Sequence, residues 1–278
     1  MTETSGRVRN IAFLGGGNMA HALIGGLVAK GVAPRSISVV EVSPAAREKL
    51  GAKYPVHLST APDAGVQRAD TMVLAVKPQD MRSALASLGS SVEGKLVISI
   101  AAGIRLSALT RWLGGHRRIV RCMPNTPALV GAGITGLYAP AEVGAEDRRT
   151  AETILGAVGE VVWVQDEKLI DPVTAVSASG PAYVFWFIEQ LAAYAESTGI
   201  PREESLKLAK HCVLGSAKLA LESSEPPAQL RKNVTSKGGT TEAALKVFEQ
   251  EQLAERLAKA LAAATRRGGE LGDELAKD

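Results

Sequence analysis

The chain has 278 residues, of which 46% are hydrophobic and 22% charged, and its formal net charge is +3. A chain of this length buries a sizeable core and favours two domains over one. The small charge and the short pairs Arg117-Arg118 and Arg266-Arg267 exclude the basic stripe that nucleic acid binding requires. Its apolar runs fall well short of the ~20 residues needed to cross a bilayer, so we expect no membrane span.

The N-terminal segment, the cysteines and the histidines indicate the compartment of the protein and whether it binds a metal. Met1–Arg9 is polar and lacks the apolar segment of a secretory signal, which predicts a cytoplasmic protein. Cys122 and Cys212 are far apart in apolar surroundings and predict two reduced core thiols. The four histidines are scattered, with no spacing that puts two ligands on one face, so we expect no metal.

Short apolar runs alternate with amphipathic segments from Asn10 to about Val164. The predicted strands are Ile11–Leu14, Ile37–Val40, Thr71–Val76, Leu96–Ile100, Ile119–Cys122, Ile134–Tyr138 and Val161–Val164. The segments between the first five strands are long enough for crossover helices, and continuous apolar runs suit a parallel sheet covered on both faces. The pattern predicts an α/β fold with a doubly wound, Rossmann-like parallel sheet, in a dinucleotide-binding domain of residues 1–165.

After Asp166 the apolar residues recur at helical spacing, which predicts an all-α C-terminal domain of residues 166–278. Gly180-Pro181 interrupts a helical pattern from about Pro172 to Ser197, so we expect a kink or a split there. A later helix carries small side chains on one face. These are Ala209, Cys212, Val213, Ser216, Ala217 and Ala220. Packing of a second chain and packing within the same chain both explain this face.

The first predicted strand leads directly into Gly15-Gly16-Gly17-Asn18-Met19-Ala20, a G-x-G-x-x-A sequence followed by an amphipathic helix. In this arrangement Gly15 permits a tight turn, Gly17 lets a pyrophosphate approach the backbone, and Ala20 allows close packing of helix on strand. The start of the helix presents free N–H groups to the phosphates. The sequence therefore predicts a dinucleotide cofactor.

The choice between NADH and NADPH stays open on sequence grounds. Glu41 ends the second predicted strand, where an acidic side chain accepts the ribose hydroxyls of NAD and repels the extra phosphate of NADP. Ser43 and Arg47 favour the opposite choice, because a hydroxyl and a guanidinium hold a phosphate.

Two further segments end predicted strands at the carboxyl edge of the sheet, where ligands bind. They are Ala75-Val76-Lys77-Pro78 and Ile100-Ala101-Ala102-Gly103. We predict that they line the nicotinamide end of the site. The alternative is a pair of ordinary loops shaped by Pro78 and Gly103.

Five segments together resemble the pyrroline-5-carboxylate reductase family. They are Gly15-Gly16-Gly17-Asn18-Met19-Ala20, Ala75-Val76-Lys77-Pro78, Arg121-Cys122-Met123-Pro124-Asn125-Thr126-Pro127, Ser179-Gly180-Pro181-Ala182-Tyr183 and Ser236-Lys237-Gly238-Gly239-Thr240-Thr241. The likeness covers nearly the whole chain and is most specific from Ala228 to Glu249. It implies an NADPH- or NADH-dependent oxidoreductase that reduces 1-pyrroline-5-carboxylate to L-proline, the last step of proline biosynthesis.

The resemblance also assigns roles to individual residues. It implies cofactor contacts at Gly15, Gly17, Asn18, Met19, Lys77, Pro78, Ala101 and Asn233. The predicted cofactor site further includes Leu14, Gly16, Glu41, Ser43, Ala75 and Val76. The resemblance places Glu167, Gly239, Thr240 and Thr241 at the substrate end, although by sequence alone Glu167 is a surface charge. It also implies a homodimer or larger homo-oligomer through the helical domain.

The chemistry of a cyclic imino acid suits the segment Ser236–Thr241. Successive backbone N–H groups in a glycine-containing turn at a helix start bind an anion, and we predict that the substrate carboxylate lies there, near Ser236. Without the resemblance, a simple N-cap explains the same residues. A cofactor that supplies hydride makes a strong acid unnecessary when the imine is already protonated. We therefore predict Thr241 as the catalytic residue, whose hydroxyl orients the ring nitrogen.

Some positions depart from the family pattern, and some alternatives remain. Ala178, Lys232 and Lys237 replace residues common in the family, and Lys237 adds a flexible cation beside the predicted carboxylate site. A related imine or β-hydroxyacid reductase is one alternative, although the latter would carry a catalytic lysine that Ser179–Tyr183 lacks. A non-catalytic dinucleotide sensor is another, against which the Gly-Gly-Thr-Thr segment argues. Asn125, between two prolines, either shapes the pocket or caps a turn.

Overall fold

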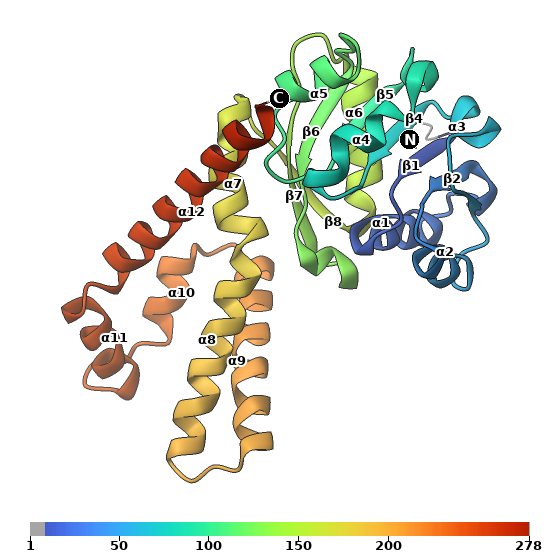
Figure 1. Cartoon of the computed structure of the whole chain (residues 1–278). Helices are drawn as coiled ribbons and strands as arrows, with labels where there is room; N and C mark the ends of the chain where they lie inside the picture. Colours follow the sequence, from blue (N-terminus) through green and yellow to red (C-terminus); the bar gives the residue numbers. More distant parts are fainter. Residues whose placement is uncertain (1–8, 278) are drawn as a thin grey trace. The chain divides into compact units, whose positions relative to one another are not determined.

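A computed structural model describes residues 9–277 (Figure 1). Residues 1–8, and with them nearly all of the polar segment that predicts a cytoplasmic protein, lie outside this range. Within residues 9–277, none of the helices has the length and apolar character to span a bilayer. The chain packs as two compact units: one reaches Ser179 and includes the chain from Ala264 onward, and the other is Gly180–Ala263. The domain boundary expected near residue 165 stays a prediction.

The first unit is built on one sheet of eight strands, in the order β3-β2-β1-β4-β5-β6-β7-β8. The strands are β1 Ile11–Leu14, β2 Ile37–Val40, β3 His57–Ser59, β4 Thr71–Leu74, β5 Leu96–Ser99, β6 Ile119–Met123, β7 Gly133–Tyr138 and β8 Gly159–Trp163. All neighbours pair in parallel except β6 and β7, which are antiparallel. The predicted doubly wound parallel sheet is confirmed, apart from the antiparallel pair β6 and β7.

Helices cover both faces of the sheet. On one face lie α1 (Asn18–Ala29), α2 (Pro44–Gly51) and α6 (Ala145–Leu155), and on the other α3 (Ala64–Arg68), α4 (Met81–Ala86) and α5 (Leu106–Trp112). Strand β1 shows why both are needed: Ile11 and Phe13 belong to one core cluster, Ala12 and Leu14 to the other, and all four are buried. Because each face of the strand is apolar, each must be covered.

The strand predictions hold, with two informative differences. The connection from Met123 to Gly133 is too short for a crossover helix, so β7 runs antiparallel to β6. Strand β3 was not predicted because it forms no apolar run. It has three residues at the sheet edge, and two of them, His57 and Ser59, are polar.

The chain after β8 is helical, as predicted. Its elements are α7 Ile170–Val173, a π-helical turn Thr174–Ala178, α8 Gly180–Ser197, α9 Arg202–Glu222, α10 Pro227–Asn233, α11 Thr240–Gln250 and α12 Leu253–Ala276. In the second unit the long helices α8 and α9 lie side by side (Figure 1).

The break predicted at Gly180-Pro181 takes the form of the π-helical turn Thr174–Ala178, which ends just before α8 begins at Gly180. Pro181 has no N–H to donate to the carbonyl of Ser177 four residues earlier. The side-chain amide of Asn125 donates to that carbonyl instead, at 3.2 Å, while its Oδ1 accepts the N–H of Ile134 at 3.0 Å. Asn125 therefore caps backbone groups from two segments, and its part in shaping a pocket stays a prediction.

The two cysteines differ. Both are free, and Cys122 is buried as predicted, where burial raises the pKa of its thiol well above the ordinary value. The prediction of a core position is wrong for Cys212, which is exposed on α9. Sequence spacing identified an apolar face of α9, but within one chain only Ser205 and Ala209 of this helix are buried.

Candidate functional site

The glycine-rich turn after β1 has a conformation that only glycine adopts without strain. Gly15 has φ +99°, and a Cβ added there would lie 2.7 Å from the carbonyl oxygen of Ala75 and 3.0 Å from Cγ1 of Val76. The N–H of Gly15 donates to the carbonyl of Val40 at 2.8 Å. The turn is thus packed between the ends of β2 and β4.

The start of α1 is open to an anion. Gly17 is its N-cap, no side chain caps the helix, and its first turn carries no acidic residue. A Cβ on Gly17 would meet nothing within 4 Å, so the backbone here faces open space. The unpaired N–H groups of a first helical turn, together with the helix dipole, attract a phosphate. These residues fit the pyrophosphate of a dinucleotide.

The loop after β2 is joined to the glycine turn by Glu41. One carboxylate oxygen accepts the N–H of Gly16 at 2.7 Å, and the other accepts the N–H of Ser43 at 2.7 Å. Arg47 donates to the main-chain carbonyl of Glu41 at 2.6 Å, and the Ser43 hydroxyl accepts from Ala46 at the start of α2. Sequence reasoning named these side chains but not their mutual contacts.

The other predicted cofactor residues leave the same edge of the sheet. Leu14 ends β1 and is buried, Ala75 and Val76 follow β4 beside Gly15, and Lys77 and Pro78 begin the next short helical turn. Buried Ala101 follows β5. This edge lies at the point where the strand order reverses between β1 and β4, the usual ligand site of such sheets.

Asn233, the remaining predicted cofactor residue, belongs to the second unit. It ends α10, where its side-chain amide donates to Glu225 at 2.8 Å and its Oδ1 accepts from Gln229 at 2.8 Å. Its role toward a cofactor stays a prediction.

The predicted substrate turn precedes α11 in the second unit. Gly238 has φ +73°, Gly239 is the N-cap, and Ser236 accepts the N–H of Gly239 through its carbonyl at 3.0 Å. The first intrahelical bond runs from Ala243 to Gly239. The N–H groups of Thr240 and Thr241 precede it and so have no intrahelical partner.

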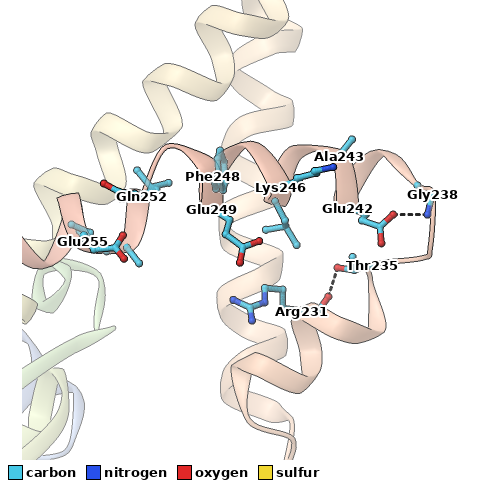
Figure 2. A pocket seen from close by; sticks show the side chains of 15 residues that line it. Arg231, Thr235, Gly238, Glu242, Ala243, Lys246, Phe248, Glu249, Gln252 and Glu255 are labelled. Carbon is cyan, nitrogen blue, oxygen red and sulfur yellow. Dashed lines mark hydrogen bonds between the residues drawn. The ribbon is translucent and has the colours of Figure 1, made fainter.

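One feature of this turn escaped the sequence analysis. Glu242 turns back and accepts the N–H of Gly238 at 2.6 Å (Figure 2). A glutamate three residues after an N-cap commonly reaches back to the N–H of the N-cap residue, and here it reaches the residue before it. The chain's own carboxylate therefore occupies one N–H of the turn, which leaves those of Thr240 and Thr241 for a ligand.

A groove of about 1110 Å³ opens beside this turn (Figure 2). Gly238, Gly239, Arg231 and Glu242 line one part of it. The rest is lined by apolar side chains such as Phe248, Leu253 and Leu257 and by charged ones such as Lys246, Glu249 and Glu255. Neither Thr240 nor Thr241 is among the described residues that line it. The groove and the free N–H groups are therefore two separate features of the turn.

Glu167 is not the surface charge that its sequence neighbours suggested. Its carboxylate pairs with Arg121 of β6 at 2.9 Å and accepts the N–H of Leu106 at 2.7 Å. Arg121 is 3% exposed and also lies 3.6 Å from Asp171. The signal was present in the sequence, because an arginine inside an apolar strand needs a buried anionic partner. The predicted contact of Glu167 with substrate stays a prediction.

Two family models match the chain. Residues 167–271 match the model for pyrroline-5-carboxylate reductase dimerisation, and residues 10–103 match that for NADP oxidoreductase, coenzyme F420-dependent.

Several known proteins are similar over nearly the whole chain. A pyrroline-5-carboxylate reductase of Pseudomonas aeruginosa is 43% identical over 95% of this chain and 97% of its own length. The structure of a pyrroline-5-carboxylate reductase from Coxiella burnetii is 43% identical, with a TM-score of 0.91 over 95% of this chain and 99% of that chain. The structure of the Plasmodium falciparum pyrroline carboxylate reductase with NADP bound is 29% identical, with a TM-score of 0.82 over 95% and 98%.

Proposed function

The chain belongs to the pyrroline-5-carboxylate reductase family, and we propose from this premise that it reduces the C=N bond of 1-pyrroline-5-carboxylate to give L-proline. The observation that carries the proposal is the glycine turn at the strand-order reversal, where Gly17 faces open space before an uncapped helix. This arrangement suits NADPH or NADH, and together with the family membership it supports an oxidoreductase of proline biosynthesis.

The residues of the first unit bind and orient the cofactor. The N–H groups of Asn18 and Met19 take the pyrophosphate, which Gly15 and Gly17 allow to approach the backbone. Ala75 to Pro78 and Ala101 border the nicotinamide end. When bound, NAD(P)H supplies the hydride for the C=N bond.

The residues of the second unit bind the substrate. The N–H groups of Thr240 and Thr241, at the positive end of α11, take the substrate carboxylate. The hydroxyl of Thr241 orients the ring nitrogen by hydrogen bonding. If the imine nitrogen is already protonated, hydride addition at the adjacent carbon gives a neutral amine and no protein group must donate a proton.

The protein forms a homo-oligomer through its helical unit. Large apolar side chains of α8 and α9 are more than half exposed in one chain. They include Phe185, Trp186, Tyr194, Leu208, Leu214 and Leu219. Exposed aromatic and leucine side chains on neighbouring helices are typical of an interface with another chain. Of the small side chains on that face of α9, Cys212, Ser216, Ala217 and Ala220 are exposed in one chain, which favours packing against a second chain, whereas Ala209 is buried.

We place the protein in the cytoplasm. The free thiols of Cys122 and Cys212 fit a reducing compartment. Fractionation of cells that express the tagged protein tests this, since a secreted or membrane-bound pool would contradict it.

The direct test of function mixes the purified protein with reduced cofactor and pyrroline-5-carboxylate and follows nicotinamide absorbance and proline formation. We expect oxidation that depends on the imino acid and yields equimolar proline. A β-hydroxyacid and a six-membered cyclic imine serve as substrate controls. Cofactor binding without oxidation would overturn the proposal in favour of a sensor, and faster turnover of either control would reassign the substrate.

A further inference from the structure

Glu41 holds two loops of the cofactor site together. It follows β2 directly, and its own N–H donates to the carbonyl of Ser59 at 2.9 Å, so its main chain continues the sheet. Each oxygen of its carboxylate accepts one backbone N–H, from Gly16 and from Ser43, at 2.7 Å in both cases. The side chain therefore bridges the glycine turn and the loop after β2.

This side chain is restrained in both position and orientation. A Cβ added to Gly16 would lie 3.3 Å from Cγ of Glu41 and 3.4 Å from its Oε2, so the glutamate packs directly against the glycine turn. If the carboxylate rotated away, the N–H groups of Gly16 and Ser43 would both lose their acceptor. The negative charge is thus fixed beside the turn.

The two groups that favour a phosphate are engaged elsewhere. The Ser43 hydroxyl accepts from the N–H of Ala46 as the N-cap of α2. Arg47 donates through Nη1 to the carbonyl of Glu41, which directs this nitrogen to the main chain. Neither contact points these groups at a ligand, although the guanidinium of Arg47 retains further donors.

We infer that Glu41 makes this protein select NADH over NADPH, an inference that rests on the cofactor site of the proposed function. An acid at the end of the second strand of such a sheet lies beside the adenosine ribose. Each carboxylate oxygen has lone pairs beyond the one used by a backbone N–H, and so accepts a ribose hydroxyl as well. The 2′-phosphate of NADPH, at the same place, is repelled by the negative charge of this restrained carboxylate.

Cofactor affinity without substrate tests the inference directly. Dissociation constants of NADH and NADPH are measured for the whole protein by calorimetry or nicotinamide fluorescence. We expect NADH to bind about 10- to 100-fold more tightly than NADPH, because like charges are held close together. The ratio should shrink as salt is raised, since salt screens charge repulsion.

Two substitutions of Glu41 separate the effect of its negative charge from the effect of its hydrogen bonds to Gly16 and Ser43. Glu41→Gln keeps the shape and removes the charge, so the ratio of the two constants should approach one. Glu41→Ser also makes room beside Ser43 and Arg47, so NADPH should become the tighter ligand. Any loosening of the glycine turn weakens both cofactors and cancels in the ratio. Glu48→Gln, which removes an exposed charge from α2, is the matched control and should leave the ratio unchanged.

The outcomes divide clearly. Equal or tighter binding of NADPH by the unaltered protein overturns the inference, as does an unchanged ratio in Glu41→Gln. Because these readouts need no imino acid, they are independent of the proposed reaction. Selective NADH binding without pyrroline-5-carboxylate reduction would support the inference about Glu41 and overturn the proposed reaction. Reduction with equal use of both cofactors would support the proposed reaction and overturn the inference.

Discussion

The two compact units differ in how much of themselves they bury. In the first unit, the neighbouring strands β2, β1, β4, β5 and β6 are almost wholly buried, and two apolar clusters fill the space under the helices on either face. In Gly180–Ala263 only Ala192, Ser205 and Ala209 are buried, while aromatic and leucine side chains are exposed. The sheet unit carries its own core, whereas the helical unit requires another chain to complete one.

The two units also differ in how they hold the residues of the predicted cofactor and substrate sites. The sheet unit offers rigid loops, each held by backbone contacts such as those of Gly15 and Glu41. The helical unit offers a turn before α11 in which the N–H groups of Thr240 and Thr241 have no intrahelical partner. Substitutions that affect one unit and spare the other therefore test the division.

The largest expected effect comes from Thr241. We expect Thr241→Ala to lower turnover by about 10²- to 10⁴-fold if the hydroxyl takes part in proton delivery, and by less if it only orients the ring. The dissociation constant of NADH should not change, because the glycine turn belongs to the other unit. Thr241→Ser, which keeps the hydroxyl, is the control and should retain most activity. Unchanged kinetics in the alanine variant would remove Thr241 from the mechanism.

The next effect concerns the core of the sheet unit. Arg121→Met leaves the carboxylates of Glu167 and Asp171 without their shared cation, and breaking a buried pair in this way costs about 3–5 kcal/mol in the free energy of unfolding. Urea unfolding followed by circular dichroism measures the loss.

The matched control for Arg121 is an exposed pair in the same unit. Arg117 lies 3.4 Å from Glu142, and the two side chains are 71% and 51% exposed. Arg117→Met should therefore change stability by no more than about 1 kcal/mol. Equal losses in the two variants would show that Arg121 has no special role in the core.

A smaller effect is expected at the glycine turn. Gly15→Ala forces a side chain into the left-handed region, at about 1–2 kcal/mol, and crowds the carbonyl of Ala75, which adds about 1–3 kcal/mol. Cofactor affinity should fall with stability. Gly31→Ala isolates the first contribution, because Gly31 has φ +91° with nothing within 4 Å of the added Cβ. If Gly31→Ala weakens cofactor binding as much as Gly15→Ala, close packing of the turn is not the cause.

Much of the sheet unit was predictable because its information is local. Seven strands are apolar runs bounded by turn residues, and the sequence Gly15–Ala20 joins the first strand to its helix in a recognisable way. Strand β3 was missed because its edge position demands no apolar run. The contacts of Glu41 and Arg121 were missed for another reason: they join residues 25 and 46 positions apart, and no local pattern encodes which partner meets which.

The helical unit was predictable in kind but less so in detail. Helical spacing identified the apolar faces, yet spacing cannot say whether a face packs within the chain or against another. Cys212 illustrates this, since its face was apolar and its side chain is exposed in one chain. The bond from Gly238 to Glu242 was missed because the turn was considered as an anion site or a simple N-cap, and no acceptor was sought within the helix that follows.

The smallest effect we predict measures how far the helical unit depends on its partner. Trp186 lies on α8 with 59% of its surface exposed. In Trp186→Glu a carboxylate replaces an aromatic side chain, and loss of an aromatic anchor from an interface costs about 2 kcal/mol or more, a rise of roughly 30-fold in the dissociation constant of the assembly. Sedimentation velocity across a concentration series measures it. Ala86→Glu, which adds the same charge to an exposed position on α4 of the sheet unit, should leave the assembly intact. If the two variants assemble alike, the exposed apolar surface of α8 is not the interface, and the contrast between the units must rest on a different helix.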